Sequence, residues 1–227
     1  MLDNNQIHPL FPTAIYQCKI DGNWNDLLHS KTEFQFDPDL PGDNTITGET
    51  RDKCLLHHEE DLNDFFFAIS SQIIECLNGA GIRTDRLSPH IMKAWFTIVN
   101  AKDNMTMHTH ACSDLSFVYY VHASPQSTLS FYNPCNPNCY SEGMMDPKSE
   151  EKTLISSNNF ITSNNHTISV AAGDLVVFPS NLNHYFKGDS GSGTYIRSVA
   201  GDVKLVLNPD LTDFDTGMIH FDHWRRF

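Results

Sequence analysis

The sequence has no long apolar run and no N-terminal leader pattern. Nowhere do roughly 18 apolar residues follow one another, which is the length that a membrane-spanning helix needs. The start, MLDNNQIHPLFPTAIY, lacks a positively charged segment followed by an apolar one, so no secretory signal peptide is expected. We therefore expect a soluble, cytoplasmic protein with no membrane partner.

Basic residues are scarce. The chain has 15 Lys and Arg against 28 Asp and Glu, a formal charge of −13. Such a charge repels phosphate backbones and leaves no basic stripe, so nucleic acid is not expected as a partner. It favours a neutral or basic substrate, such as a small amine or a polypeptide side chain.

Cysteines are few and scattered for a chain of this length, which needs no disulfide framework. Six occur in 227 residues, and we expect most of them to be free thiols. Cys135 and Cys139 lie close together in the segment NPCNPNCY, but a zinc clip would need two more ligands, and none follows at a familiar spacing. The zinc clip stays open as the lesser alternative.

The length fits one domain, residues 1–227. We expect an N-terminal strand and support helices in residues 1–90, a β-rich core in 91–207, and a C-terminal tail in 208–227. The core is interrupted by a polar insertion, 133–165, that has no clear periodicity. Loops of this length are often functional.

Helical spacing of apolar residues predicts one long helix over residues 59–79, ended by the glycines at 79 and 81. A short helix is predicted over residues 21–30. The predicted strands are short β-branched or aromatic runs separated by turn residues: IYQCKI near the N-terminus, then 91–100, 115–122, 128–132, 167–170, 174–179 and 195–207. Many short strands with two helices indicate a mainly β protein, a sandwich or jelly roll.

Two histidines stand two residues apart in MTMHTHACSDLSFVYYV. In an extended chain, His108 and His110 point to the same side, so both imidazoles can reach one metal ion. A third histidine, His184, follows the apolar strand of AAGDLVVFPSNLNHYF, in what reads as a short polar loop. Three protein ligands with open positions suit a metal that also binds small molecules. The bland alternative is a pair of exposed histidines at a strand end.

Further residues of the predicted pocket follow from strand alternation. Ser116 and Tyr120 share the side of His108 and His110, whereas Tyr119 faces the other way. Arg197 lies on the strand after His184; facing the interior of a barrel, it would need an anion, which a ligand carboxylate can supply. A salt bridge to Asp174 or Asp202, or exposure to solvent, is the alternative for this arginine.

Taken in order, these segments resemble the 2-oxoglutarate and Fe(II)-dependent dioxygenase superfamily, and within it a poorly characterised microbial and phage group of oxygenases. The resemblance is carried by HPLFPTAIY, AWFTIVNAKDNMTMHTHACSDLSFVYYV, VAAGDLVVFPSNLNHYF and TYIRSVAGDV. It implies a double-stranded β-helix (jelly roll) with supporting α-helices. It also implies Fe(II) as the metal and 2-oxoglutarate as the cosubstrate, and, for a phage-encoded protein, the cytoplasm of a host.

The resemblance assigns the metal to His108, His110 and His184, and the 2-oxoglutarate carboxylate to Arg197 and Tyr120. Ser116 joins them as a cofactor-binding candidate. One departure stands out, because the superfamily usually has a carboxylate where this chain has His110. Three neutral imidazoles leave more positive charge on the metal.

Asp114 is the alternative ligand to His110, since it is a carboxylate of compatible alternation four residues further on. Trp95 and Asn100 are candidates for the substrate side, although Trp95 is equally suited to the core.

The predicted function is a non-haem Fe(II) oxygenase that uses O₂ and 2-oxoglutarate, hydroxylates a small-molecule or polypeptide substrate and releases succinate and CO₂. The first alternative is a cupin-like three-histidine metal enzyme or metal-binding module that does not use 2-oxoglutarate. The second is a non-enzymatic interaction protein on a decayed jelly roll. A homodimer is compatible with the sequence.

Overall fold

The computed structural model describes residues 13–20, 22–33, 45–47, 54–100, 105–124, 126–132, 165–187, 195–208 and 225. The predicted insertion, apart from Asn165, lies outside the described residues, as do Cys135, Cys139 and nearly all of the predicted tail. The α-helices are α1 (Trp24–Glu33) and α2 (Asn63–Gly79), and the short 3-10 helices are η1 (Leu56–His58) and η2 (Glu60–Leu62). The strands are β1 (Tyr16–Lys19), β2 (Thr45–Thr47), β3 (Leu87–Asn100), β4 (Leu115–His122), β5 (Thr128–Tyr132), β6 (Asn165–Ser169), β7 (Asp174–Pro179), β8 (His184–Lys187) and β9 (Tyr195–Leu207).

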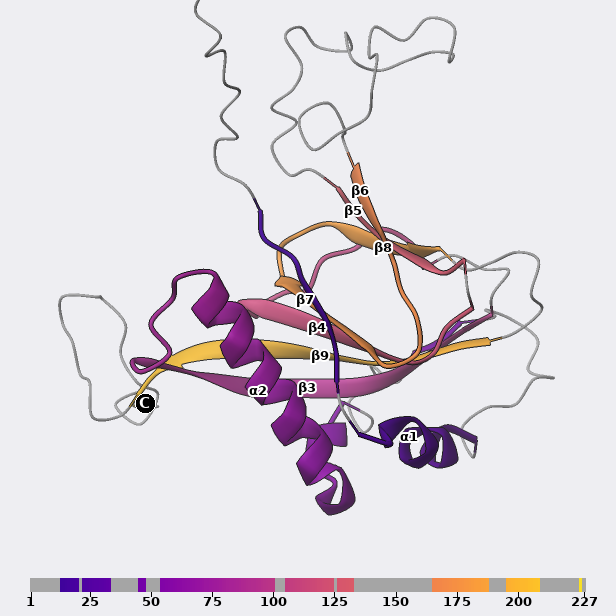
Figure 1. Cartoon of the computed structure of the whole chain (residues 1–227), viewed down its shortest axis with the longest axis horizontal. Coiled ribbons are helices and arrows are strands. Elements are labelled where there is room, and N and C mark those ends of the chain that lie inside the picture. Colours follow the sequence, from indigo (N-terminus) through magenta and orange to yellow (C-terminus); the bar gives the residue numbers. More distant parts are fainter. Residues whose placement is uncertain are drawn as a thin grey trace, which may run out of the picture.

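Helix α2 forms where the apolar spacing predicts a helix. Its buried side chains, Phe65, Phe66, Ile69, Ile73 and Leu77, repeat at three- and four-residue intervals and form one face. That face packs on the large sheet, in front of which α2 runs in Figure 1.

The C-terminus of α2 is closed by a glycine in the left-handed region. Gly81 has φ 79°. The amide of Ile82 donates to the carbonyl of Leu77 and that of Gly81 to the carbonyl of Asn78, both at 2.9 Å. This is the Schellman arrangement, which satisfies the last carbonyls of a helix. Among the described residues, no helix is long and apolar enough to cross a membrane.

Two antiparallel sheets make up most of the described structure. The larger has six strands in the order β1-β7-β4-β9-β3-β2, and the smaller has three in the order β6-β5-β8. Figure 1 shows β5, β6 and β8 together above the larger sheet, with α2 crossing in front of that sheet and α1 below it. The mainly β prediction with supporting helices is thereby confirmed.

Strand β8 corrects the prediction of a loop around His184. His184 begins a four-residue strand that pairs with β5, with Phe131 opposite it. Residues 105–110 run along the other side of β8: the amide of Met105 donates to the carbonyl of Phe186 at 3.1 Å, and His108 forms a bridge with His184. The segment then leads into β4, so it passes from the smaller sheet to the larger one.

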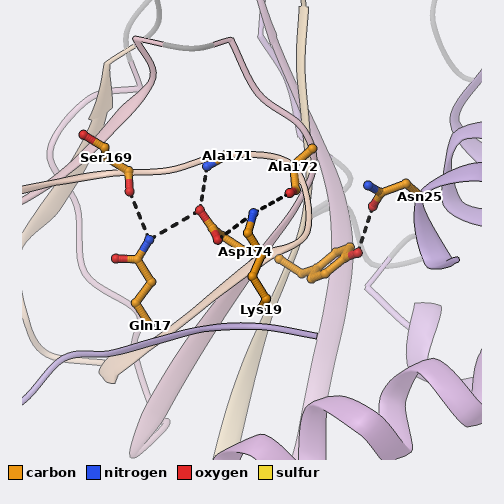
Figure 2. A network of polar contacts seen from close by, with 8 residues as sticks. Gln17, Lys19, Asn25, Ser169, Ala171, Ala172 and Asp174 are labelled. Carbon is orange, nitrogen blue, oxygen red and sulfur yellow. Dashed lines mark hydrogen bonds and ion pairs between the residues drawn. The ribbon is translucent and has the colours of Figure 1, made fainter. Parts of the chain in front are cut away.

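Strand β1 closes one edge of the larger sheet beside β7. Asp174 accepts hydrogen bonds from the Ala171 amide (2.7 Å) and from Gln17 (3.4 Å), and lies 2.9 Å from Lys19 Nζ (Figure 2). Lys19 also donates to the carbonyl of Ala172 at 2.7 Å. These contacts fasten the turn before β7 to the edge strand, and they give Asp174 partners other than Arg197.

Alternation along the strands separates two cores. On the helix side, Phe117, Tyr119 and Val199 pack with α1 and α2 in one cluster. On the opposite side, between the two sheets, lies a second cluster that includes Tyr120 and Ile196. Whether a strand residue meets the helices or the space between the sheets is therefore decided by its position in the alternation.

Candidate metal centre

Three imidazoles meet where the chain passes between the sheets. His108, His110 and His184 each offer a ring nitrogen, and these atoms all lie within 4.8 Å of one another. The ring centroids are 5.3 Å apart for His108 and His110, 4.3 Å for His108 and His184, and 5.2 Å for His110 and His184. The geometry brings together the three histidines that the sequence predicts as ligands.

Main-chain contacts set the spacing of two of these histidines. The amide of His108 donates to the carbonyl of His184 at 3.0 Å, and the amide of His184 donates back to the carbonyl of His108 at 3.1 Å. His110 is fixed separately, since its amide donates to the carbonyl of Ser180 at 2.9 Å. Main-chain hydrogen bonds therefore fix the backbone from which each of the three rings projects.

Each imidazole has its Nδ1 atom occupied. Nδ1 of His108 contacts the carbonyl of Thr106 at 2.8 Å, and Nδ1 of His184 contacts that of Leu182 at 3.0 Å. A carbonyl oxygen only accepts, so these two Nδ1 atoms donate and carry the hydrogen. The lone pair of each neutral ring then lies on Nε2. This is the arrangement in which an imidazole binds a metal with its other nitrogen held by a second partner.

Burial keeps His184 uncharged. Its side chain lies between the sheets with 3% of the residue exposed. Burial lowers the pKa of His184 to about 4, against the hydrogen bond to the Leu182 carbonyl, which raises it, and the neighbouring imidazoles lower it further. At neutral pH the ring is therefore in the neutral form that a metal ligand requires.

The third imidazole has a carboxylate behind it. Nδ1 of His110 lies 2.5 Å from Oδ1 of Asp202, a residue of β9 that is 0% exposed. Ser116 donates to the same oxygen at 2.9 Å, and Lys93 Nζ lies 3.0 Å from the other oxygen. Burial raises the pKa of Asp202, but His110, Lys93 and Ser116 together hold it below its ordinary value.

Asp202 is the residue of this centre that the sequence prediction missed. It was considered only as a salt-bridge partner for Arg197, and the structure contradicts that pairing. The available signal was alternation: Asp202 is five positions from Arg197 on β9, an odd number, so the two side chains point to opposite faces.

Asp114, the alternative ligand, is turned away from the imidazoles. One carboxylate oxygen accepts from Lys204 Nζ and the other from the amide of Leu205, both at 2.8 Å. Cys112, which has φ 64°, interrupts the extended chain between His110 and β4, so regular alternation does not continue across it. The structure does not bring Asp114 to the three histidines.

Ser116 and Tyr120 lie on the side of β4 that faces the space between the sheets, and Tyr119 lies on the helix side. Ser116 Oγ is engaged by Asp202 and by Ser180 Oγ at 2.9 Å. Tyr120 is 2% exposed, and burial raises the pKa of its hydroxyl. Tyr119 donates to Asn25 of α1 at 2.8 Å, and burial raises the pKa of Tyr119 to about 12.

Arg197 lies on the helix side of β9. It pairs in the sheet with Ile98, and its neighbour two positions on, Val199, belongs to the helix-side core. Its Nη1 atom contacts the ring of His29 in α1, and its buried Nε has no hydrogen-bond partner among the described residues. The structure does not bring Arg197 to the three imidazoles, contrary to the expectation that it faces the interior. Its role as the cosubstrate anchor stays a prediction.

Trp95 lies against the metal centre. Its ring stacks on His110 with centroids 5.6 Å apart and 29° between the planes, and it is 4% exposed. Lys93 Nζ lies over the Trp95 ring, 4.9 Å from its centroid. Trp95 therefore packs against the ring of His110, and its role toward a substrate stays a prediction. Asn100 ends β3, and its side chain lies outside the described structure.

Residues 93–198, which include all three histidines, match the protein family described as Putative 2OG-Fe(II) oxygenase. No curated protein matches the chain.

Solved structures similar to this chain include an epimerase and a carbocyclase from nogalamycin biosynthesis and the protein HygX. The epimerase SnoN, in complex with Fe3+, alpha ketoglutarate (2-oxoglutarate) and nogalamycin RO, has a TM-score of 0.52 and 11% identity, covering 87% of this chain and 82% of SnoN. The carbocyclase SnoK from nogalamycin biosynthesis gives 0.51 and 8%, covering 90% and 86%. HygX from Streptomyces hygroscopicus, with nickel and 2-oxoglutarate bound, gives 0.50 and 11%, covering 85% and 82%. At these identities the similarity shows a shared fold.

Proposed function

We propose that this chain is a 2OG-Fe(II) oxygenase, an iron enzyme that hydroxylates a substrate with O₂ and 2-oxoglutarate. The match of residues 93–198 confirms the resemblance found in the sequence. The observation that carries the proposal is the convergence of His108, His110 and His184 within 4.8 Å, with no competing partner on their Nε2 atoms among the described hydrogen bonds.

The donor set fits iron. Imidazole nitrogens suit Fe(II), and three protein ligands leave positions for a chelating cosubstrate and for O₂. His108, His110 and His184 would hold the ion. When bound, the iron and 2-oxoglutarate would supply the oxidising chemistry, with succinate and CO₂ as co-products. The protein's own contribution is to fix the three rings, to bury His184, and to present Trp95 beside the centre.

The architecture proposed is a double-stranded β-helix, or jelly roll, in a single domain with its core at residues 91–207. The two facing antiparallel sheets and the similarity in fold to SnoN and SnoK support it. In this arrangement His108, His110 and His184 would hold the metal at the edge of the space between the sheets, and that space would receive the cosubstrate.

Tyr120 is the predicted cosubstrate residue that the geometry supports best. In the sheet it is opposite Ser198, which in turn is opposite Thr97. All three side chains are on the inner face, so β4, β9 and β3 contribute one row of hydroxyl groups. A carboxylate can accept hydrogen bonds from such a row.

The proposal is tested by anaerobic addition of Fe(II) and then 2-oxoglutarate to the purified protein. Chelation of the keto acid to the iron is expected to give a visible charge-transfer band, and substrate-independent turnover is expected to release succinate. His184→Ala should lose both signals, while Asp114→Asn, a change outside the triad, should keep them. Absence of the band and of succinate in the wild-type protein would rule the function out.

A second function is favoured by the position of Arg197. The lysines on the inner side of β3 and β9, Lys93 and Lys204, are both paired with carboxylates, Asp202 and Asp114. Among the described residues of these strands, no arginine faces the inner side. A three-histidine metal enzyme that does not use 2-oxoglutarate would need no such cation. Iron binding without release of succinate would identify this alternative, and full 2-oxoglutarate turnover in Arg197→Ala would refute the anchor prediction alone.

A further inference from the structure

Position 110 distinguishes this metal centre from the usual ligand set of two histidines and one carboxylate. An all-imidazole set brings no negative charge to a divalent cation. Among the described residues, the carboxylate that contacts the three histidines is Asp202. It contacts His110, the residue found where the usual ligand set has its carboxylate.

The three imidazoles are not held alike. His108 and His184 each rest on a backbone carbonyl, at 2.8 Å and 3.0 Å, whereas His110 rests on a carboxylate at 2.5 Å. Hydrogen bonds with an ionised partner are shorter and about twice as strong as those between neutral groups. Partial negative charge is therefore passed to one ring of the three.

Asp202 is built into the sheet to make this contact. It lies between Ser116 of β4 and Lys93 of β3 in the ladder; Ser116 donates a hydrogen bond to its Oδ1, and Lys93 forms an ion pair with its Oδ2. The hydroxyl of Ser116 donates its one hydrogen to Asp202. The Ser180 hydroxyl, 2.9 Å from that of Ser116, is therefore the donor in the contact between the two serines. A buried carboxylate persists when it is paired and hydrogen-bonded. Oδ1 of Asp202 contacts His110 and Ser116, whereas Oδ2 has no hydrogen-bond partner among the described residues and is paired with Lys93 alone.

One face of the His110 ring is also in contact with a neighbouring side chain. Trp95 stacks on the ring, and Lys93 lies over Trp95 while it contacts Asp202. The ring is thus oriented by one edge contact and one face contact. No comparable set surrounds His108 among the described residues.

We propose that Asp202 is a positioning residue of the metal centre, which supplies through Nδ1 of His110 the negative charge that a carboxylate ligand would supply directly. The proposal rests on the proposed metal site and adds to it a residue outside the ligand set. It explains how a histidine can replace the usual carboxylate ligand. The negative charge of a carboxylate is still present, but Asp202 carries it behind His110 instead of binding the metal directly.

The test is metal affinity in the full-length protein, measured with Co(II) alone by competition with a chelating dye. Asp202→Asn keeps the shape and an acceptor oxygen but removes the charge. Loss of the hydrogen-bond partner on the other nitrogen of a metal-binding imidazole typically lowers metal affinity by about 10- to 100-fold. We expect Asp202→Asn to lower the Co(II) affinity by a factor in that range. Asp114→Asn is the matched control, a carboxylate paired with a lysine but away from the triad, and should leave the affinity unchanged.

A rescue experiment separates charge from structure. His110→Asp restores a carboxylate ligand, but in the presence of Asp202 it sets two carboxylates against each other. We therefore expect the double variant His110→Asp/Asp202→Asn to bind Co(II) more tightly than either single variant. A merely structural role for Asp202 predicts additive losses, so a double variant weaker than both singles would overturn the proposal.

A readout without metal completes the test. The His110 Nδ1 proton should resonate far downfield in the metal-free wild type and move upfield in Asp202→Asn. If Asp202→Asn does not fold, Ser116→Ala weakens the same carboxylate and should give a smaller loss of Co(II) affinity; unchanged affinity there overturns the role of Asp202. Failure of the wild type to bind Co(II) would instead refute the proposed function, so the two outcomes are distinguishable.

Discussion

Replacing Gly201 by alanine should destabilise the fold, because the strand has no room for a side chain there. Gly201 lies on the helix side of β9, opposite Phe117 of β4 and Ala94 of β3. A Cβ atom at this position would lie 2.5 Å from Cε1 of Phe117 and 2.8 Å from the carbonyl oxygen of Lys93. Neither neighbour can yield easily, since the Phe117 ring is 0% exposed and the carbonyl belongs to the sheet.

The magnitude follows from two opposing effects. Overpacking of a filled core costs about 1 to 3 kcal/mol. Alanine also reduces the freedom of the unfolded chain, which returns about 0.4 to 1 kcal/mol. Because backbone and buried ring are both in the way, we expect a net loss of about 2 kcal/mol. In a protein of this size that lowers the melting temperature by roughly 4 to 8 °C.

Circular dichroism melts of the metal-free protein measure this loss. Gly79→Ala is the control: it is a glycine at the last residue of α2, where an added Cβ meets nothing within 4 Å, and its melting temperature should equal or exceed that of the wild type. Gly201→Ala should also weaken Co(II) binding, because Asp202 is the next residue. A Gly201→Ala protein as stable as the wild type would show that the packing argument is wrong.

Three further outcomes are expected. Asp174→Ala should lower the free energy of unfolding by about 1 to 3 kcal/mol, because it leaves the Ala171 amide without an acceptor. Lys19→Met removes an exposed partner of Asp174 and should lower it by less than about 1 kcal/mol. Urea denaturation of both variants checks this order. Tyr119→Phe should cost about 0.5 to 1.5 kcal/mol by removing the bond to Asn25, and an unchanged urea midpoint would contradict it. The free energy of unfolding of the metal-free protein should fall as the pH drops from the ordinary histidine pKa of 6.5 to about 4, because the unfolded state protonates His184 first; His184→Gln should flatten that slope.

Strands whose own residues favour extended structure were predictable from the sequence. The bounds of β4, β5, β7 and β9 equal the predicted ranges, since β-branched and aromatic runs end there at turn residues. β8 was missed because HYFK is too short and too polar to be recognised alone. It is a strand through its partners, β5 on one side and residues 105–108 on the other, and such long-range pairing leaves no local signal.

The same distinction applies to the metal centre. The His108 and His110 pair has a local spacing that predicts convergence. His184 was predicted from its place after an apolar strand, and the resemblance assigned it to the same metal. Asp202 acts through the register between strands, which the sequence does not show. Alternation, applied to β4, predicted that Tyr120 faces inward; applied to β9 it places Asp202 and Arg197 on opposite faces, and the structure shows that Asp202 is the one that faces inward.

The way the three ligands are attached has a consequence for the whole molecule. His108 and His184 belong to the smaller sheet through their shared main-chain bridge, whereas His110 is attached to the larger sheet through Asp202 of β9 and Trp95 of β3. A bound ion would therefore connect the two sheets at one edge, and its binding energy would add to the stability of the fold. Without the ion this connection is missing, and we expect the three-stranded sheet to loosen from the larger one first.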